Sequence, residues 1–344
     1  MVTNGPAWHT DSVPTTNLER LLTATFGAVS IVASTDVNRG NGIFSDVIRL
    51  ELAPTMPDQA IPASVVLKKP APGANGEASL TTGACEREAL AYQSITAQSP
   101  LRTPICYAMN REGWFLLEDL SSHRQVDQVD GASLSDARSV VAALGTLHSY
   151  WQDRINHLNR PPRTNPLTTI PTERFADGWA KLQARWAADL EPEAIAGYAA
   201  VASQLDQAKA AFGRLSPLTI IHGDPRLGNI VFDDAAPIFL DWQQIAIGPG
   251  AADLAWFLAT SLTPETRRAN YSALLAAYAE ASSTPRETVE AELQLAWLLP
   301  GLLSLLLATR EAEDEQAALF IRVSLNRIGL ALSDYSVAAA VAAT

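Results

Sequence analysis

The segment HGDPRLGN, residues 222–229, brings a histidine, a carboxylate and an amide into eight positions. Asp224 stands directly before Pro225, and Asp followed by Pro is typical of a helix start, so a purely structural cap is one interpretation. Asn229 follows five positions after Asp224, and Asp241 ends a later apolar run. Buried Asp and Asn side chains cost free energy unless they are hydrogen-bonded or bind an ion. Three such groups so close together therefore indicate catalysis or metal binding.

The two apolar runs that follow this segment predict a β-hairpin with its turn centred on Ala235. Pairing about that centre sets Phe232 opposite Ile238 and Asn229 opposite Asp241. An amide oxygen and a carboxylate would then lie together at one end of a buried ribbon. Mg²⁺ prefers oxygen ligands and often leaves positions to phosphates and water, so this pair suits a Mg²⁺ site.

The elements that must position these groups change in character near residue 120. Before it, β-branched residues broken by Gly, Asn and Pro predict a small, mostly antiparallel sheet with one or two helices. After it, apolar residues recur at helical spacing, and Ala- and Leu-rich helices are expected from residue 251 to about 333. Strands are expected at 31–35, 42–53, 63–69, 103–110 and 113–120, with a tight turn at 110–113 and a helix at 84–98.

One helix of the second part is expected to begin at Ser133 and to turn a single apolar stripe inward. Because His148 lies on that stripe, we interpret it as a hydrogen-bonded core residue rather than a ligand. The stripe consists of Val140, Val141, Leu144, Leu147, His148 and Trp151.

The spacing His-x-Asp-x-x-x-x-Asn followed by a strand-terminal Asp resembles that of the protein-kinase-like fold. With Gly223 in the second position and LDWQQ in place of Asp-Phe-Gly, the chain is similar to the aminoglycoside phosphotransferase and choline kinase superfamily. The runs LLEDLS, HGDPRLGN and DWQQIAIGPGAADLAWFL most resemble its ecdysteroid-kinase-like branch. The resemblance extends from about residue 40 to about residue 262.

The resemblance implies an α+β, bilobal protein-kinase-like fold. A β-rich, nucleotide-binding lobe would comprise residues 1–120, and a mainly helical lobe with the catalytic loop, metal site and acceptor site would comprise residues 121–344. It also implies an ATP- and Mg²⁺-dependent phosphotransferase acting on a hydroxyl group of a small molecule. Asp224 would be the catalytic base, and Asn229 and Asp241 would hold Mg²⁺ at the ATP phosphates.

Four residues are candidates for a turn that covers the phosphates. Gly40 and Gly42 allow backbone N–H groups to approach phosphate, Asn41 lies between them, and Ser45 is at the third turn position. The segment lacks the last glycine of Gly-x-Gly-x-x-Gly. An ordinary hairpin turn is therefore the alternative interpretation.

A strand lysine and a helix carboxylate are the other expected nucleotide-site groups. Lys68 and Lys69 point to opposite faces, because side chains alternate along a strand. The family pattern selects Lys68 over Lys69 and Glu88 over Glu86. It therefore predicts a Lys68–Glu88 pair. For either lysine, the structural alternative is a solvated side chain at a strand end. At the connection between the lobes, the carbonyl of Glu118 would meet adenine.

The remaining polar residues of the motifs have structural alternatives. The backbone N–H of Leu120 would complete the adenine contact, although plain packing between the lobes competes with this assignment. His222 is expected to organise its loop by hydrogen bonding, and Arg226 to be structural, with contact to a phosphate as the alternative. The family places Asp253 behind the catalytic loop as a brace, and a helix cap is the other possibility for it.

Composition narrows the partners and the location. The formal charge is −12, with 25 Lys and Arg against 37 Asp and Glu, which argues against a nucleic-acid partner. Cys85 and Cys106 cannot form a disulfide framework or a zinc site and fit a reducing cytoplasm. The N-terminus lacks the pattern of a signal peptide, and the apolar run from Leu295, interrupted by Pro300, is too short to span a bilayer and predicts a buried helix.

Two other classes of function remain open on the sequence alone, a regulatory nucleotide-binding pseudokinase and a metal-dependent hydrolase that uses the Asp224 cluster without ATP. The acceptor is not identified by any spacing rule. An acidic run at 311–315 suits a cationic acceptor or a solvated helix face, and the tryptophan-rich helices suit a lipophilic alcohol or an ordinary core. Oligomeric state and the preference between ATP and GTP are not encoded in these patterns.

Overall fold

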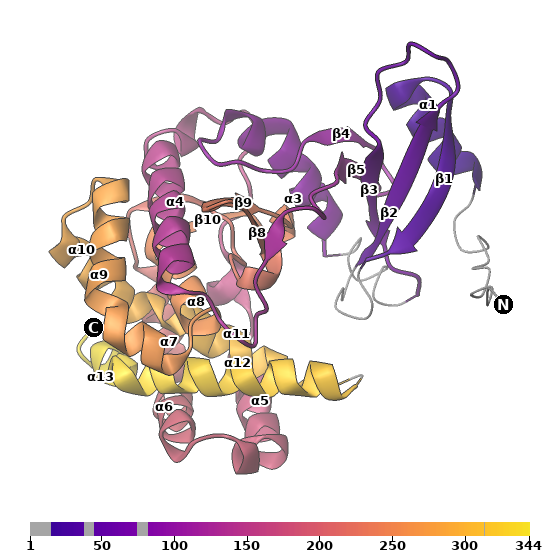
Figure 1. The fold of residues 1–344 in the computed structure, drawn as a ribbon. Coiled ribbons are helices and arrows are strands. Elements are labelled where there is room, and N and C mark those ends of the chain that lie inside the picture. Colours follow the sequence, from indigo (N-terminus) through magenta and orange to yellow (C-terminus); the bar gives the residue numbers. More distant parts are fainter. Residues whose placement is uncertain (1–14, 38–44, 74–81, 313) are drawn as a thin grey trace. The chain divides into compact units, whose positions relative to one another are not determined.

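The computed structural model describes residues 15–37, 45–73, 82–312 and 314–344. The chain divides into two compact units (Figure 1). The β unit comprises Met1–Cys85 and Pro104–Asp119, and the helical unit comprises Glu86–Thr103 and Leu120–Thr344. The β unit therefore ends next to the division predicted at residue 120. Residues 86–103, predicted to lie in the first lobe, group with the helical unit instead.

A five-stranded antiparallel sheet forms the β unit, with strand order β1-β2-β3-β5-β4. The tight turn predicted before β5 is present, because the side chain of Asn110 accepts the backbone N–H groups of Glu112 and Trp114. The strands are β1 (Val29–Asp36), β2 (Ser45–Pro54), β3 (Ser64–Pro70), β4 (Cys106–Met109) and β5 (Phe115–Glu118).

One face of this sheet packs against helix α1 (Thr15–Phe26), which the sequence analysis did not predict. Leu18 and Leu22 of α1 are buried against alternate residues of the central strands, as expected when side chains alternate between the two faces of a sheet. The other buried members of this core are Leu50, Leu52, Val65, Leu67, Trp114 and Leu116.

Helices dominate the second unit and surround two small antiparallel sheets, β7-β10 and β6-β8-β9. The short strands are β6 (Arg124–Gln125), β7 (Leu218–Ile221), β8 (Ile230–Asp233), β9 (Ala236–Phe239) and β10 (Ala246–Pro249). The helices are α3 (Ala84–Leu90), which begins in the β unit, α4 (Leu134–Gln152), α5 (Thr172–Arg185), α6 (Pro192–Ala202), α7 (Leu205–Gly213), α8 (Gly250–Thr260), α9 (Pro264–Ser282), α10 (Arg286–Ala296), α11 (Leu298–Leu307), α12 (Glu315–Asp334) and α13 (Val337–Ala342).

Helix α4 confirms its predicted start and stripe. The hydroxyl of Ser133 accepts the backbone N–H of Asp136, which satisfies one of the donors left free at a helix start. All six residues of the predicted stripe are buried. The stripe thus faces the interior of the helical unit, where α4 contacts β7, the strand that leads into the HGD segment.

Helices α6 and α12 cross at close range through glycine (Figure 1). A Cβ atom on Gly197 would lie 2.4 Å from the carbonyl oxygen of Gly329, and one on Gly329 would lie 2.7 Å from the carbonyl oxygen of Ala194. Side chains at these positions would force the two helices apart.

The apolar run from Leu295 is part of the core, as predicted. By length and apolarity alone, Arg286–Leu307 would suffice to cross a membrane, but 61% of its most apolar window is buried inside the protein. Trp297 separates α10 from α11, and Pro300 is buried in the first turn of α11. This is the burial expected of a core helix.

The β8-β9 hairpin forms, but its predicted register is wrong by one residue. Val231 pairs with Ile238, and Phe232 pairs with Pro237 rather than Ile238. The turn is tighter than expected because Asp234 adopts a left-handed conformation, with φ of 51°. Such a conformation is typical of two-residue hairpin turns and tolerated by Asp.

This register changes the predicted partner of Asn229. The backbone N–H of Leu240 donates to the carbonyl of Asn229 at 2.8 Å, so Asn229 faces Leu240 and not Asp241. Asp241 lies one residue beyond the paired region and is left-handed, with φ of 58° and ψ of 70°. Its position at the site is therefore set by this backbone turn rather than by strand pairing.

Candidate active site

The segment HGD is held from behind by a buried carboxylate on α8. Asp253 is fully buried and accepts the backbone N–H of His222 at 2.6 Å and that of Gly223 at 2.9 Å. Its Oδ2 also lies 3.3 Å from Nε2 of His148. Because the carboxylate is inside the first turn of α8, with Pro249 as the N-cap residue, it is a brace for the loop and not a helix cap.

His148 connects this brace to a second helix. Its Nδ1 lies 2.7 Å from the hydroxyl of Tyr278 on α9. Burial raises the pKa of Tyr278 well above its ordinary value, so its hydroxyl keeps its proton. The two ring nitrogens of His148 therefore contact Tyr278 on one side and Asp253 on the other. This confirms the interpretation of His148 as a hydrogen-bonded core residue.

His222 is fully buried, and both of its ring nitrogens have partners. Nε2 donates to the carbonyl of Leu240 at 2.9 Å, while Nδ1 accepts the backbone N–H of Asp224 at 3.3 Å. The ring also packs beside Trp242, with ring centroids 4.6 Å apart. With both nitrogens occupied, His222 organises the loop, as the sequence analysis expected.

Position 223 requires glycine because its backbone approaches the backbone of Gln244 closely. It is left-handed, with φ of +84°, and a Cβ atom would lie 2.3 Å from the carbonyl oxygen of Gln244. The loop that contains Asp224 therefore packs backbone to backbone against the loop that contains Asp241. Arg87 holds the second loop from α3, where its Nε donates to the carbonyl of Gln243 at 2.8 Å.

The carboxylate of Asp224 is oriented by side chains on both of its oxygens. Trp256 of α8 donates from Nε1 to Oδ1 at 2.8 Å, and Asn229 donates from Nδ2 to Oδ2 at 2.9 Å. Nε of Arg226 lies 3.4 Å from Oδ2, and the Asp224 side chain remains 21% exposed. The sequence analysis missed Trp256, and its position in the run DLAWFL carried no signal for this contact.

Opposing influences act on the pKa of Asp224. Burial raises this pKa most strongly, and the negative charge of Asp241 raises it further. The charge of Arg226 and the hydrogen bond from Trp256 act in the opposite direction. The net pKa is raised, which is the direction that suits a carboxylate acting as a general base.

Asn229 has an amide orientation fixed by Asp224. Its Nδ2 donates to both the carbonyl and the carboxylate of Asp224, at 3.0 and 2.9 Å. Within the described segments, its Oδ1 accepts no hydrogen bond and is the atom left for another ligand. Asp241 accepts the side-chain amide of Gln243 at 3.1 Å.

The ligand oxygens of Asn229 and Asp241 suit a cation that takes its other ligands from water or from a bound molecule. In the part of the chain that the structure describes, no three His, Cys, Asp or Glu side chains form a cluster that could hold a metal ion alone. One amide oxygen and one carboxylate suit Mg²⁺, which retains water or takes phosphate oxygens at its other positions.

Three residues distant in sequence support the HGDPRLGN loop from its other end. Ser261 accepts the backbone N–H of Leu227 at 3.1 Å, and the side chain of Gln128 accepts that of Gly228 at 3.0 Å. Arg327 of α12 donates to the carbonyl of Gln128 at 2.8 Å and thereby fixes this support. None of these was predicted, because no local pattern reports contacts between residues so far apart.

The guanidinium of Arg226 packs between Gly228 and the aromatic ring of Phe320. Its guanidinium carbon lies 5.5 Å from the ring centroid of Phe320, and a Cβ atom on Gly228 would lie 2.3 Å from Nη1. The side chain is 25% exposed. Packing and the nearby Asp224 carboxylate account for its position, in line with the structural interpretation.

The predicted nucleotide residues are only partly described by the structure. Gly40, Asn41 and Gly42 lie outside the described residues. Ser45 is the first residue of β2 and pairs with Pro70.

Lys68 and Lys69 occupy opposite faces of the sheet and are both buried. Lys69 pairs with Asp46 across β2 and β3, and its Nζ lies 2.7 Å from the Asp46 carboxylate. Lys68 pairs with Val47 and Phe115, on the face opposite the α1 core. Burial excludes the interpretation of either residue as a solvated lysine at a strand end.

Glu88, Glu118 and Leu120 also take defined positions. Glu88 is buried in α3, with 2% of its surface exposed. The side chain of Glu118 accepts the backbone N–H of Ile105 at 3.0 Å. Leu120 is buried with Val231 in a small apolar cluster of the helical unit.

A family model described as "APH: Phosphotransferase enzyme family" matches residues 60–292. The chain belongs to this family. The match confirms the predicted phosphotransferase family, and with it the enzyme class of a small-molecule kinase. The ecdysteroid-kinase-like branch stays a prediction.

Solved structures similar to this phosphotransferase have the same fold at low sequence identity. A choline/ethanolamine kinase family protein from Mesorhizobium loti has a TM-score of 0.56 and 15% identity, over 97% of this chain and 96% of that one. The choline kinase LicA from Streptococcus pneumoniae has a TM-score of 0.54 and 11% identity, over 91% and 98%. The APH(2″)-IIa of a ternary complex with streptomycin and ATP has a TM-score of 0.53 and 10% identity, over 92% and 95%. They confirm the α+β, protein-kinase-like fold.

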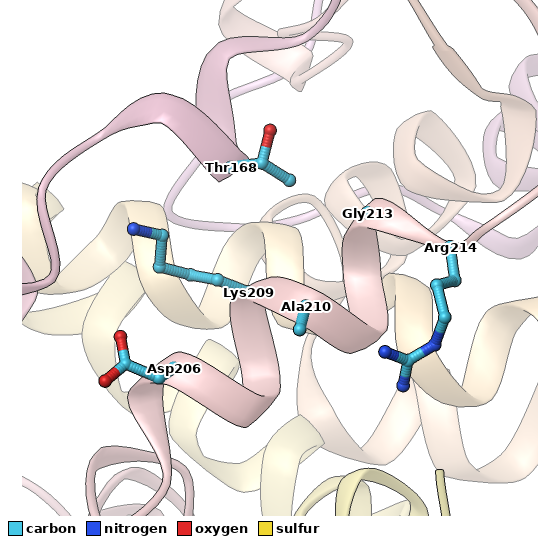
Figure 2. Close-up of a pocket in the computed structure, with 6 residues that line it drawn as sticks. All are labelled: Thr168, Asp206, Lys209, Ala210, Gly213 and Arg214. Atoms are coloured by element: carbon cyan, nitrogen blue, oxygen red, sulfur yellow. The ribbon is translucent and has the colours of Figure 1, made fainter.

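A hollow of about 480 Å³ lies elsewhere on the helical unit of this phosphotransferase (Figure 2). None of its lining residues is a predicted site residue. Its lysine, Lys209, is already occupied, because Nζ donates to the carbonyl of Ile170 at 2.6 Å and to the hydroxyl of Thr172 at 3.2 Å. The hollow is lined by Thr168, Asp206, Lys209, Ala210, Gly213 and Arg214.

Proposed function

We propose that this phosphotransferase is an ATP- and Mg²⁺-dependent kinase that phosphorylates a hydroxyl group of a small molecule, with Asp224 as the catalytic base. The observation that carries the proposal is the orientation of the Asp224 carboxylate by Trp256 and Asn229, in a loop braced by Asp253. A carboxylate held in this way, still partly exposed and with a raised pKa, is suited to accept the proton of an alcohol.

Asn229 and Asp241 would hold the Mg²⁺ ions. The Asn229 amide supports this role because both of its donor contacts go to Asp224, which directs the carbonyl oxygen to another ligand. Bound there, Mg²⁺ would neutralise the negative charge of the ATP phosphates, which is the main requirement of phosphoryl transfer.

Lys68 and Glu88 would complete the nucleotide site as an ion pair, with the turn at Gly40, Asn41, Gly42 and Ser45 over the phosphates. Lys69 lies on the face of the sheet that packs against α1, whereas Lys68 lies on the opposite face, which supports Lys68 as the phosphate-binding lysine. The carbonyl of Glu118 and the N–H of Leu120 would meet adenine. A cytoplasmic location and a small-molecule acceptor that carries a hydroxyl group, without a nucleic-acid or membrane partner, are part of the same proposal.

The test is acceptor-dependent release of ADP from Mg-ATP, measured across aminoglycosides, amino alcohols, sugars, nucleosides and sterol-like alcohols beside the variant Asp224→Asn. We expect one class to stimulate release, and the variant to bind nucleotide normally while its turnover falls by about 10² to 10⁴. Undiminished turnover in the variant would remove Asp224 from the reaction. Nucleotide binding without transfer to any acceptor would favour the pseudokinase, and activity without ATP would favour the hydrolase.

A further inference from the structure

The two oxygens of the Asp224 carboxylate are not equally occupied. Each carboxylate oxygen offers two lone-pair directions. Oδ2 receives Nδ2 of Asn229 at 2.9 Å and has Nε of Arg226 at 3.4 Å. Among the described residues, Oδ1 receives Nε1 of Trp256 at 2.8 Å and has no second neighbouring group of this kind. Oδ2 is thus flanked by two polar groups and Oδ1 by one, the indole of Trp256.

The two carboxylate oxygens of Asp224 also face different parts of the candidate site. Asn229, which would hold Mg²⁺ under the proposed function, is on the Oδ2 side. A hydroxyl that gives its proton to Asp224 meets fewer neighbouring groups at Oδ1, because Asn229 and Arg226 both flank Oδ2. The indole of Trp256 lies at that approach.

Trp256 is also distinct from the rest of its helix. Every other residue of α8, from Gly250 to Thr260, is buried, whereas Trp256 retains partial exposure. A partly exposed ring on an otherwise buried helix leaves part of its surface available to a ligand.

The need of an indole N–H for a hydrogen-bond partner does not by itself explain why Trp256 contacts Asp224. The buried Nε1 atoms of Trp151, Trp186 and Trp297 have no hydrogen-bond partner among the described residues. The fold thus retains unpaired indole N–H groups elsewhere at a tolerable cost. Two indole N–H groups do have partners: Trp242 donates to the carbonyl of Phe239 at 3.2 Å, and Trp256 donates to the candidate catalytic carboxylate.

We propose that Trp256 is the positioning residue for the acceptor: its N–H occupies one lone pair of Asp224 Oδ1, which directs the acceptor hydroxyl to the other, and its ring packs against the carbon skeleton beside that hydroxyl. The inference rests on the proposed function. In the transfer, the acceptor oxygen forms a bond to the γ-phosphorus of ATP, and the bridging P–O bond breaks with its electron pair leaving on ADP. The hydroxyl proton passes to Oδ1 of Asp224.

The kinetic test compares Trp256→Phe, Trp256→Leu and the control Trp186→Phe, using the acceptor that the ADP-release screen identifies. Trp186 is a matched control because it is also a partly exposed tryptophan, with an Nε1 that has no partner to lose. Trp256→Phe retains the ring but loses the N–H, so we expect kcat to fall about tenfold with the acceptor KM changed by less than about twofold.

Trp256→Leu loses the ring face as well, so we expect it to raise the acceptor KM about tenfold in addition. The KM for Mg-ATP should stay within about twofold in both variants, and Trp186→Phe should change neither constant. An unchanged kcat in Trp256→Phe, or a rise in the KM for Mg-ATP equal to that for the acceptor, would overturn the proposal. A comparable Tm in all three variants excludes a general loss of structure.

A second measurement does not depend on turnover. The full chain labelled with ¹⁵N-tryptophan has eight indole N–H signals, and Trp256→Phe identifies the one of interest by its loss. We expect Asp224→Asn to shift that signal more than the other seven, because a carboxylate acceptor is replaced by an amide. A Trp256 signal unmoved by Asp224→Asn would contradict the hydrogen bond and the proposal with it. If the wild type transfers phosphate to no acceptor while the signal shifts, the proposed function fails and the contact stands.

Discussion

Asp253 binds the backbone N–H of His222 at 2.6 Å, and through it α8 determines the conformation of the candidate catalytic loop. Its second oxygen binds the next N–H of the loop at 2.9 Å. A carboxylate that accepts two adjacent backbone N–H groups fixes both peptide planes. The position of Asp224, the following residue, depends on this arrangement.

Asp253→Asn should impair both stability and activity. An amide in place of the carboxylate directs an NH₂ group at a backbone N–H or at His148, and leaves a buried donor unsatisfied. We expect a loss of about 3 kcal/mol in the free energy of unfolding and a fall of about 100-fold in kcat. Urea unfolding and ADP release measure the two effects.

Asp136→Asn is the control for this prediction, because Asp136 is also a buried carboxylate of the helical unit, paired with Arg124. It should lower stability but leave kcat within about twofold, since the described contacts of Asp136 are with Arg124 and Ser133 and not with the loop. Equal losses of kcat in the two variants would mean that stability alone, and not loop geometry, governs activity.

Substitution of the two neighbouring lysines of β3 should affect nucleotide binding to different extents. Lys69 is engaged by Asp46 at 2.7 Å, whereas Lys68 lies on the opposite face of the sheet. We expect Lys68→Ala to weaken Mg-ATP binding about tenfold or more and Lys69→Ala to change it less than about threefold, measured by calorimetry. The reverse order would assign Lys69 as the phosphate-binding lysine.

Glu292 should make stability depend on pH. Burial raises the pKa of this α10 carboxyl from 4.5 to about 7, so the folded protein retains its proton at pH values where the unfolded chain has lost it. The unfolded state then binds fewer protons, and the free energy of unfolding falls as pH rises from about 4.5 to about 7. Below this range the group has no effect, and above it the cost is constant.

Glu292→Gln removes this cost, and urea unfolding at several pH values measures it. After allowance for the partial exposure of Glu292, the variant should be about 1 kcal/mol more stable than the wild type at pH 8 and equal to it at pH 4. A difference that does not vary with pH would show that the carboxyl is not titrating in this range.

Gly223→Ala should be far more harmful than Gly73→Ala. Both residues are left-handed, with φ of +84° and +75°, but only Gly223 has an atom in the way, the carbonyl oxygen of Gln244 at 2.3 Å from an added Cβ. A Cβ atom on Gly73 would meet no atom of the described residues within 4 Å. We expect Gly73→Ala to cost about 1 kcal/mol by conformation alone, and Gly223→Ala to cost roughly 3 kcal/mol or more with loss of turnover. Similar costs in thermal unfolding would contradict the close approach.

Local sequence patterns predicted the parts of the site that depend on neighbouring residues. The stripe of α4, the strands of the β unit and the roles of His222 and Asp253 follow from spacing and from the motif. The hairpin register was wrong because one left-handed residue, Asp234, decides whether the turn has two residues or three. Apolar alternation alone does not report that conformation.

The features of the site that the sequence did not predict depend on contacts between residues far apart in the chain. Arg327 reaches Gln128 across 199 positions, and Trp256 reaches Asp224 across 32. Neither belongs to a local pattern, since an arginine on a long helix and a tryptophan in an apolar run each have an ordinary structural explanation. Only the packing of α12 and α8 against the loop reveals what they bind.

The helical unit itself supplies the described groups that hold the HGD loop in place. They are Asp253, Trp256, Gln128, Ser261 and Arg327. The loop therefore loses its conformational freedom when the chain folds, not when a ligand arrives. Ordering a residue costs about 1–2 kcal/mol of backbone entropy, and for this loop that cost is met before any encounter with substrate. The free energy of binding is then available to bring the reacting groups together rather than to assemble the base.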